Sequence, residues 1–279
     1  MNNNLRLARN AVWYAAMIAF SLLILVPFLW MLTTSLKAPS DIFLFPPEWI
    51  PNPWRWDNYA SVFATQPLFL RHYANSLYIA CLVTVGTCLV GSLAGYAFAK
   101  IEFPFRNALF LLLLSGMMIP GEVTIIPNFI WMSQLGLADT HVPLIVPHML
   151  GIEGIFGVFL FRQFFLTVPK DTDEAAEIDG CSPWGTFCRI MLPLGAPCFA
   201  TLAIFTFLNT WEDFLSPLIF VSSEELFTLP VAMKLFTDMA GTDWHLLMAA
   251  SVMATVPLLA VFFVAQRKFI EGVAMTGLK

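Results

Sequence analysis

The chain has 279 residues, of which 58% are hydrophobic and only 12% are charged, and its formal net charge is −5. Soluble domains carry about 25% charged residues, so a soluble protein of this composition would expose large apolar patches. The small net charge, without a basic stripe, argues against a nucleic-acid-binding protein. The composition therefore predicts an all-α, polytopic membrane protein.

Six apolar runs are long enough to cross a bilayer, which requires about 20 helical residues. The first follows Arg6 and Arg9 and exceeds the roughly 7–15 apolar residues of a signal peptide, so we expect it to remain uncleaved. The predicted spans are residues 11–34, 73–98, 107–130, 143–165, 196–220 and 245–266.

These spans divide the chain into three predicted regions. Residues 1–71 would form the first helix and a long extracytoplasmic loop, residues 72–267 a five-helix core, and residues 268–279 a cytoplasmic tail. With six spans both termini lie on one side, and that side holds ten of the fourteen lysines and arginines. Because basic residues favour cytoplasmic loops, both termini are predicted to be cytoplasmic.

Small residues and prolines distinguish the second and third spans. Gly91 and Gly95 form a GxxxG step, which favours close packing of two helices. The third span contains Pro120-Gly121 and Pro127, which predict a kink or break near its middle. Such a break either lines a substrate path or is only a bend, and both interpretations remain open.

The segment at residues 168–193 follows the fourth span and reads as two short helices joined by a glycine. Asp171 is expected to cap the first helix, with Glu174 completing a capping box, and Gly180 is expected to end it in a left-handed conformation. Ser182 and Pro183 should begin the second helix.

Pro193 is expected to end this second helix. Phe187, Ile190 and Met191 form an apolar stripe on it, which would serve either a docked partner or packing within the chain.

The sequence contains no recognisable nucleotide-binding or catalytic motif. The P-loop pattern GxxxxGK[ST] is absent, as are HExxH and GxSxG, and the five cysteines form no CxxC pair. We therefore expect no catalytic residue, metal or cofactor in this chain. Uphill transport would draw its energy from a partner or from an ion gradient.

The segment at residues 168–193 resembles the EAA loop of bacterial binding-protein-dependent ABC importers. The resemblance rests on Glu174, Ala175, Ala176, Asp179, Gly180, Phe187, Ile190, Leu192 and Pro193. In that family the loop is a coupling helix that seats in a groove on the ATPase, which implies a coupling role for Glu174, Ala175, Ala176, Asp179, Gly180, Phe187 and Pro193. Cys181 stands where the family usually has alanine.

The resemblance to the maltose-type sugar permeases covers nearly the whole chain. It is carried by Asn75–Leu77, Leu93–Lys100, Phe161–Phe165, Trp211, Phe214 and Pro217. Glu212 stands where that pattern usually has asparagine. The last residues, Gly277, Leu278 and Lys279, are similar to a tail that reaches the ATPase interface in that family.

The resemblance implies a type I ABC importer permease in a bacterial inner (cell) membrane. Its implied partners are a second permease subunit, a dimeric ATPase that binds ATP and magnesium, an extracytoplasmic solute-binding protein and membrane lipid. The implied cargo is a sugar, an oligosaccharide, or a sugar or glycerol phosphate. The alternative is a secondary transporter driven by an ion gradient through Glu153, Glu212 and Asp213.

A polar face on the fifth span is the predicted substrate path. Thr206, Asn209, Glu212, Asp213 and Ser216 recur at helical spacing on an otherwise apolar segment. Charges inside a membrane are costly and usually face a watery cavity. Contact with a partner permease, or a position nearer the outer surface, would also explain this face.

Three further polar residues lie within apolar segments. Glu122, His148 and Glu153 either line the path or form hydrogen bonds where helices meet. The second interpretation is slightly favoured for all three from the sequence.

Overall fold

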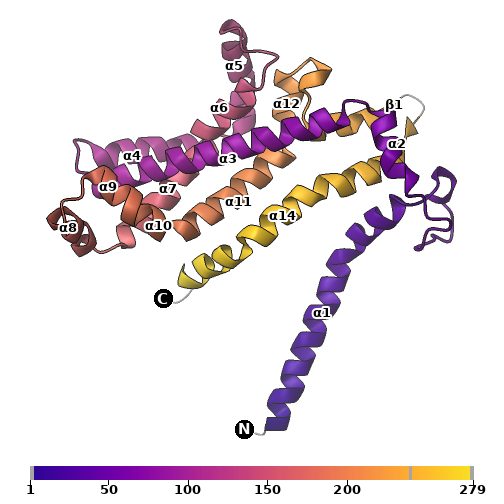
Figure 1. Cartoon of the computed structure of the whole chain (residues 1–279), viewed down its shortest axis with the longest axis horizontal. Coiled ribbons are helices and arrows are strands. Elements are labelled where there is room, and N and C mark those ends of the chain that lie inside the picture. Colours follow the sequence, from indigo (N-terminus) through magenta and orange to yellow (C-terminus); the bar gives the residue numbers. More distant parts are fainter. Residues whose placement is uncertain (1–2, 239–240, 277–279) are drawn as a thin grey trace. The chain divides into compact units, whose positions relative to one another are not determined.

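The computed structural model describes residues 3–238 and 241–276 of the chain (Figure 1). The predicted tail residues Gly277, Leu278 and Lys279 lie outside the described residues. The chain divides into two compact units, one of residues 1–69 and 233–256, the other of residues 70–232 and 257–279.

The first unit contains the N-terminal helix and a long connection that follows it. Its elements are α1 (Asn3–Thr34), η1 (Pro39–Asp41), α2 (Asp57–Thr65), η5 (Met233–Phe236), β1 (Thr237–Asp238), β2 (Gly241–Thr242) and the first part of α14 (Trp244–Thr276). The two strands pair antiparallel, with Thr237 opposite Thr242.

The connection after α1 is held by hydrogen bonds to its own backbone. The Asn58 amide on α2 donates to the carbonyl oxygens of Ser35 and Lys37, both at 2.9 Å. The Lys37 ammonium lies 4.1 Å from the ring centre of Trp30, where the aromatic face stabilises a buried cation. These contacts fix α2 against the end of α1.

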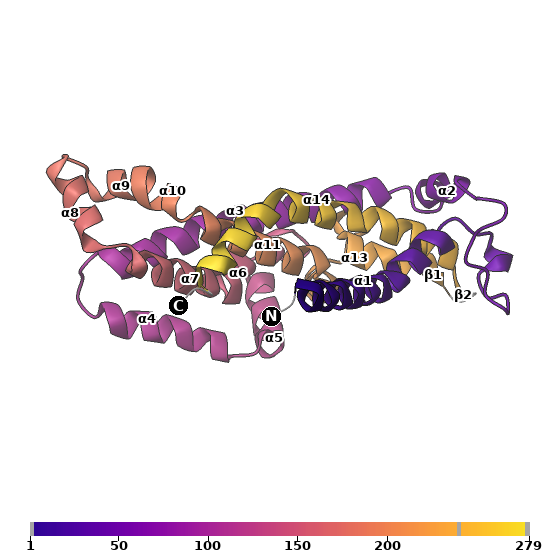
Figure 2. The same cartoon turned by 90° about the horizontal axis from the view of Figure 1, so that it is seen from below.

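The second unit contains the remaining helices and the later part of α14, from Pro257 onward. The remaining helices are α3 (Phe69–Lys100), α4 (Arg106–Ser115), η2 (Gly116–Met118), α5 (Gly121–Gln134), α6 (Val142–Leu150), α7 (Ile152–Thr167), α8 (Lys170–Ile178), α9 (Pro183–Thr186), the π-helix η3 (Phe187–Met191), α10 (Leu192–Leu194), α11 (Ala196–Glu212), α12 (Leu215–Phe220), η4 (Glu224–Leu226) and α13 (Leu229–Ala232). Figure 2 shows α8, α9 and α10 together at one end of this unit.

Among the described residues, four helical segments are long and apolar enough to cross a membrane. They are Asn10–Thr34, Phe69–Lys100, Val142–Thr167 and Trp244–Val264. Two further pairs pass the same test when joined, although each pair is sharply bent. Counting each bent pair as one span gives up to six spans, the number predicted from hydropathy.

The two bent pairs differ in how well the sequence predicted them. Arg106–Met118 and Gly121–Gln134 meet at 97°, which confirms the predicted break at Pro120. Pro127 lies inside α5 and does not end it. The prediction of one helix over residues 196–220 is wrong, because α11 ends at Glu212 and α12 begins at Leu215.

Close backbone contact joins α3 to α7. A Cβ added at Gly91 would lie 3.0 Å from the backbone of Gly157, and one at Gly95 would lie 2.6 Å from the Phe161 Cβ. The packing interpretation of the GxxxG step is thus confirmed. Between apolar helices in lipid, such van der Waals contact replaces hydrophobic burial as the source of stability.

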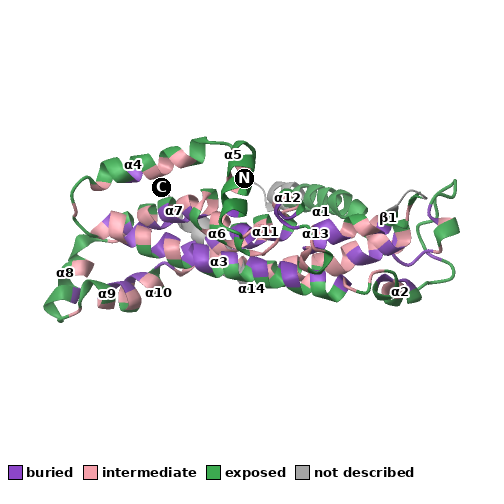
Figure 3. Cartoon of the chain, turned by 90° about the horizontal axis from the view of Figure 1, so that it is seen from above, coloured by how far each residue is buried: buried purple, intermediate pink, exposed green. Residues whose placement is uncertain are grey.

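Two clusters of buried residues lie in the described part of the second unit. One surrounds Phe161, Phe165 and Met191 near the loop helices, and the other surrounds Val83 and Leu144. Figure 3 shows buried positions along α3, whereas α4, α5 and α8 are largely exposed. The structure therefore leaves apolar helix faces for lipid or for other subunits.

Candidate functional site

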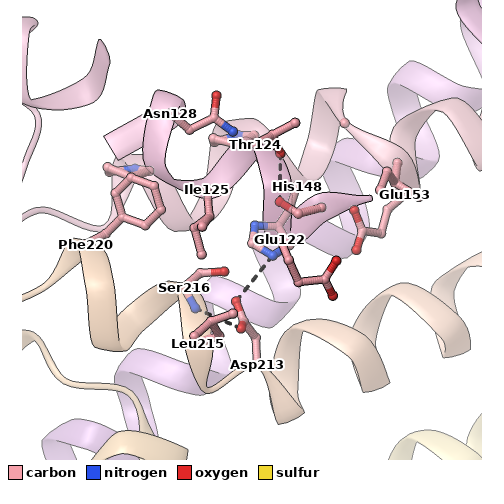
Figure 4. Close-up of a pocket in the computed structure, with 15 residues that line it drawn as sticks. Glu122, Thr124, Ile125, Asn128, His148, Glu153, Asp213, Leu215, Ser216 and Phe220 are labelled. Carbon is pink, nitrogen blue, oxygen red and sulfur yellow. Dashed lines mark hydrogen bonds and ion pairs between the residues drawn. The ribbon is translucent and has the colours of Figure 1, made fainter. Parts of the chain in front are cut away.

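Three helix breaks of the second unit meet at one cavity of about 340 Å³, here called the His148 cavity (Figure 4). Its lining includes the first turn of α5, the junction of α6 and α7 at Gly151, and the segment between α11 and α12. Backbone that leaves the helical path inside a membrane is tolerated where it lines a cavity. The location of all three breaks at one point therefore marks a candidate site.

Asp213 joins two of these elements. Its Oδ2 lies 3.3 Å from the His148 Nε2, and its Oδ1 accepts a hydrogen bond from the Ser216 amide at 3.1 Å. Asp213 itself has extended backbone (φ −63°, ψ 118°), so the helix stops there and restarts at Leu215. The carboxylate thus binds α6 on one side and begins α12 on the other, as Figure 4 shows.

Two neighbouring cavities continue from the first. The Thr206 cavity, of about 250 Å³, is lined by Thr206 and Asn209 of α11 together with apolar side chains of α7 and η2. The Glu212 cavity, of about 460 Å³, is lined by Asn209, Glu212 and Asp213. Glu153 lines all three cavities and therefore connects them.

The residues of the predicted polar face do not lie on one continuous helix. A single helical stripe is wrong, because the helix is interrupted at Asp213 and Ser216 belongs to α12. The break brings its members to the cavities all the same. Each of them lines at least one of the three: Thr206, Asn209, Glu212, Asp213 and Ser216.

The three residues left open by the sequence also line the His148 cavity. Glu122 lies in the first turn of α5, His148 on α6 and Glu153 in the first turn of α7. His148 fits both interpretations, since it lines the cavity and pairs with Asp213. No group of three or more His, Cys, Asp or Glu side chains within residues 3–238 and 241–276 is arranged to hold a metal ion.

Sequence reasoning missed the polar residues on α5. Thr124 and Asn128 line the His148 cavity from one face of this helix. Their spacing of four residues in an apolar segment was the available signal, because residues four apart share a helix face.

The second candidate site is the loop of α8, α9 and α10. Gly180 has φ +79°, as predicted for the glycine that ends the first short helix. The Ser182 Oγ accepts the Gly185 amide at 3.2 Å, and Pro183 occupies the first position of α9. The predicted turn and second cap are therefore confirmed.

Two details of this loop differ from prediction. Asp171 does not cap α8, which begins after Pro169 without a side-chain cap, so Asp171 lies inside the first turn. Pro193 does not end the second helix, because the helical path runs from α9 through η3 into α10 and bends by 73° at Gly195. Pro193 lies in α10 directly after the π-helix η3 and two residues before the bend at Gly195.

The loop is anchored on the chain's own core. Phe187 and Met191 are buried beside Tyr96 and Phe165, so these members of the apolar stripe pack within the chain. The Tyr96 hydroxyl also donates to the Pro183 carbonyl oxygen at 3.2 Å.

The residues with an implied coupling role therefore separate into two groups. Ala176 and Phe187 are buried. The exposed group is Glu174, Ala175, Asp179, Gly180 and Pro193. The outward apolar surface of the loop was not predicted: it consists of Ile178, which is 86% exposed, and Trp184, which is 64% exposed.

Comparisons with known proteins give these sites a family. Residues 88–274 match the family described as "Binding-protein-dependent transport system inner membrane component". The arabinooligosaccharides transport system permease protein AraQ of Bacillus subtilis (strain 168) is 36% identical over 93% of this chain and 92% of its own length. The sn-glycerol-3-phosphate transport system permease protein UgpE of Yersinia pestis bv. Antiqua (strain Antiqua) is 33% identical over 90% of this chain and 91% of its own.

A solved structure shares the fold. A chain of a bacterial ABC transporter involved in the import of the acidic polysaccharide alginate superimposes with a TM-score of 0.80 at 21% identity, and the match covers 96% of this chain and 99% of that one. The family match spans well over half of the sequence, and full-length relatives exceed 30% identity. This chain therefore belongs to the family of inner-membrane permease components of binding-protein-dependent ABC transporters.

Proposed function

We propose that this chain is one of two permease subunits of an ATP-driven importer for a sugar or a related polar solute. Relatives named for arabinooligosaccharide and glycerol-phosphate transport support the cargo class. The family membership favours an ATP-driven system over the ion-gradient alternative that Glu153, Glu212 and Asp213 suggested from sequence. The three cavities joined at Glu153 would form this chain's part of the path.

The observation that carries the proposal is the exposed apolar surface of the α8–α10 loop. Ile178 and Trp184 face away from the chain, while Phe187 and Met191 hold the same loop to the bundle core. The inner side of this loop is packed on the helix bundle and its outer side exposes apolar side chains. Movement of a protein docked on the outer side would therefore be transmitted to the helices. The docked protein would be the ATPase, because this chain carries no P-loop.

The proposed mechanism is a two-state exchange. Closure of the ATP-bound ATPase dimer would move the α8–α10 loop, and the helices rooted on it would change from inward-open to outward-open. An extracytoplasmic binding protein would then release its solute into the cavities. Such coupling requires that ATP and solute stabilise the two states by different amounts.

The proposed orientation places this loop and both termini in the cytoplasm. It follows from the excess of lysine and arginine on that side of the six spans. The long connection around α2 would then lie outside, where it could meet the binding protein.

Co-purification of the detergent-solubilised, tagged chain tests the proposal. An ATPase and a second permease are expected to come down with it. Trp184→Ala should lose the ATPase and retain the second permease, because tryptophan is enriched among interface hot spots, whose truncation costs about 2 kcal/mol or more. Trp131→Ala, at an exposed tryptophan of α5, is the matched control and should retain both. An ATPase that stays bound to the Trp184→Ala chain would contradict the docking surface.

A further inference from the structure

The ionisable side chains that line the three cavities are predominantly acidic. Their acidic side chains are Glu122, Glu153, Glu212 and Asp213, and His148 is the single basic group among them. Within the described part of the chain, no lysine or arginine lines any of the three. His148 already pairs with Asp213, so it offsets at most one of the four carboxylates.

The Thr206 hydroxyl is a second feature, independent of the acidic side chains, that indicates a ligand site. Thr206 is only 1% exposed and lines the Thr206 cavity, yet its Oγ1 has no hydrogen-bond partner in the described part of the chain. A buried hydroxyl without a partner is unfavourable unless something else satisfies it. The Asn209 amide, which borders the same cavity, adds a donor and an acceptor.

Apart from Thr206, Asn209 and the Glu153 carboxylate, the wall of the Thr206 cavity is apolar. It is formed by Met117, Ile152, Phe156 and Phe205. Aromatic and aliphatic walls with a few convergent hydrogen-bonding groups are typical of sites for small molecules. Sugars match this combination, because they present hydroxyl groups at the edge of the ring and C–H groups on its faces.

We propose that this chain's part of the path selects by charge: it admits neutral or amine-bearing, hydroxyl-rich solutes and excludes anionic ones such as sugar phosphates and uronates. This inference rests on the proposed function. An anion entering past Glu153 would meet carboxylates in all three cavities without a fixed cation to compensate it. Like charges in a poorly hydrated site repel more strongly than in bulk water. Of the transported classes named for relatives, a neutral oligosaccharide fits these walls and a glycerol phosphate does not.

A thiol reporter at Asn209→Cys tests the proposal without knowledge of the cargo. The exposed or half-buried Cys81, Cys181 and Cys188 are first replaced by serine, while the buried Cys88 and Cys198 remain. Membrane vesicles containing the complete transport complex are then treated with two methanethiosulfonates of similar size, one bearing trimethylammonium and the other sulfonate. The same background without the reporter gives the rate at residual cysteines.

The measured quantity is the ratio of the reaction rate of the cationic reagent to that of the anionic reagent. This ratio is expected to be about tenfold higher at Asn209→Cys than at Thr65→Cys, a thiol on the exposed end of α2. Adding Glu153→Gln should lower this preference. Glu102→Gln, which removes an exposed carboxylate outside the three cavities, should leave it unchanged. Equal preference at the two thiols would overturn charge selection but leave the proposed path intact. Failure of both reagents to react at Asn209→Cys would contradict the water-filled path itself.

Discussion

The Lys100 Nζ lies 2.5 Å from the Asp173 Oδ2, and this ion pair joins the last turn of α3 to the first turn of α8. Lys100 also donates to the Val168 carbonyl oxygen at 2.9 Å, just before α8 begins. Both side chains are largely buried. The pair therefore holds the proposed docking loop to α3, a long helix of the bundle. Movement of the loop would consequently be transmitted to α3.

Lys100→Met should uncouple ATP hydrolysis from uptake. Methionine keeps the apolar stem and removes the cation, which leaves the Asp173 carboxylate without its partner. We expect uptake to fall while ATPase activity persists, with coupling weakened by about 0.5–2 kcal/mol. Both rates should be measured in reconstituted vesicles.

The matched control for Lys100→Met is Arg55→Met. It breaks an Arg55–Asp57 pair of similar type whose side chains are about half exposed. Exposed pairs contribute at most about 1 kcal/mol, so this variant should transport normally. A Lys100→Met complex that couples normally would show that the ion pair is only a local stabiliser.

Gly180→Pro should disrupt the turn between α8 and α9. Gly180 has φ +79°, whereas the proline ring fixes φ near −65°. The two short helices could then no longer meet at their present angle. We expect uptake to be lost while the permease subunits still assemble, as measured by transport and by gel filtration of the complex.

Gly185→Ala serves as the control for the Gly180 substitution. An added Cβ at Gly185 would make only ordinary contacts, the nearest at 3.5 Å. This variant should import at the normal rate. Normal import by Gly180→Pro would exclude a coupling role for the turn.

The sequence predicted the helix breaks that are caused by a single proline or glycine. Pro120 interrupts the third span because it lacks an N–H and clashes with the preceding turn, and the structure bends there by 97°. Gly180 predicted a left-handed turn for the same kind of local reason. Signals of this kind depend on the conformational preference of one residue, so they can be read without knowledge of the fold.

The break at Asp213 was missed because the hydropathy of residues 196–220 continues through it. A local signal was available: an aspartate side chain can accept a hydrogen bond from a backbone amide a few residues later at the start of a helix, and the Asp213 Oδ1 accepts one from the Ser216 amide. The pairing of Asp213 with His148 depends on tertiary structure, since the two are 65 residues apart in sequence. Polar residues could be predicted to lie within the membrane, but not which of them share a cavity.

Gly95→Ala should destabilise the contact between α3 and α7. The added Cβ would lie 2.6 Å from the Phe161 Cβ and 2.9 Å from the Arg162 backbone nitrogen, and backbone cannot move aside cheaply. Overpacking of this kind costs about 1–3 kcal/mol. The thermal unfolding temperature of the purified complex in detergent should fall.

Gly116→Ala is a suitable comparison for Gly95→Ala. Its Cβ would approach only the flexible tip of Ile155, at 3.1 Å. The unfolding temperature should change less than for Gly95→Ala. Equal effects of the two substitutions would argue against a specific α3–α7 contact.

Asp139 should make the loop between α5 and α6 sensitive to acid. Hydrogen bonds from the Ser223 hydroxyl and from the Ser223 and Ser222 amides hold the pKa of Asp139 below its usual value. A lowered folded-state pKa means that the stabilisation is complete above the unfolded value of about 3.9 and is lost as pH falls through the folded value. The protection of the Ser222 and Ser223 amides, measured as their exchange rate relative to the intrinsic rate at the same pH, should therefore fall only below about pH 4.

Asp139→Asn should accelerate the same two amides at neutral pH, because the neutral side chain is a weaker acceptor than the carboxylate. Exchange in α7, which has no contact with this carboxylate in the described structure, provides the internal reference. Protection at Ser222 and Ser223 that is unchanged in the variant would rule out this role.

The His148–Asp213 pair should stabilise the cavity walls as well as line the path, and substitutions can separate the two effects. Removing one member of a largely buried ion pair costs about 3–5 kcal/mol when the other remains charged. Asp213→Ala also removes the acceptor for the Ser216 amide, so it should unsettle the start of α12 and lower both uptake and thermal stability.

Asn209→Ala supplies the contrast, because Asn209 borders two cavities without belonging to an ion pair of the described chain. This variant should reduce uptake while the unfolding temperature stays near that of the parent. Transport and thermal unfolding are measured on the same assembled complex, with co-purification of the partner subunits as the check on assembly. Normal uptake in both variants would remove the cavities from the path, and a loss of stability in Asn209→Ala equal to that in Asp213→Ala would assign the polar face to packing alone.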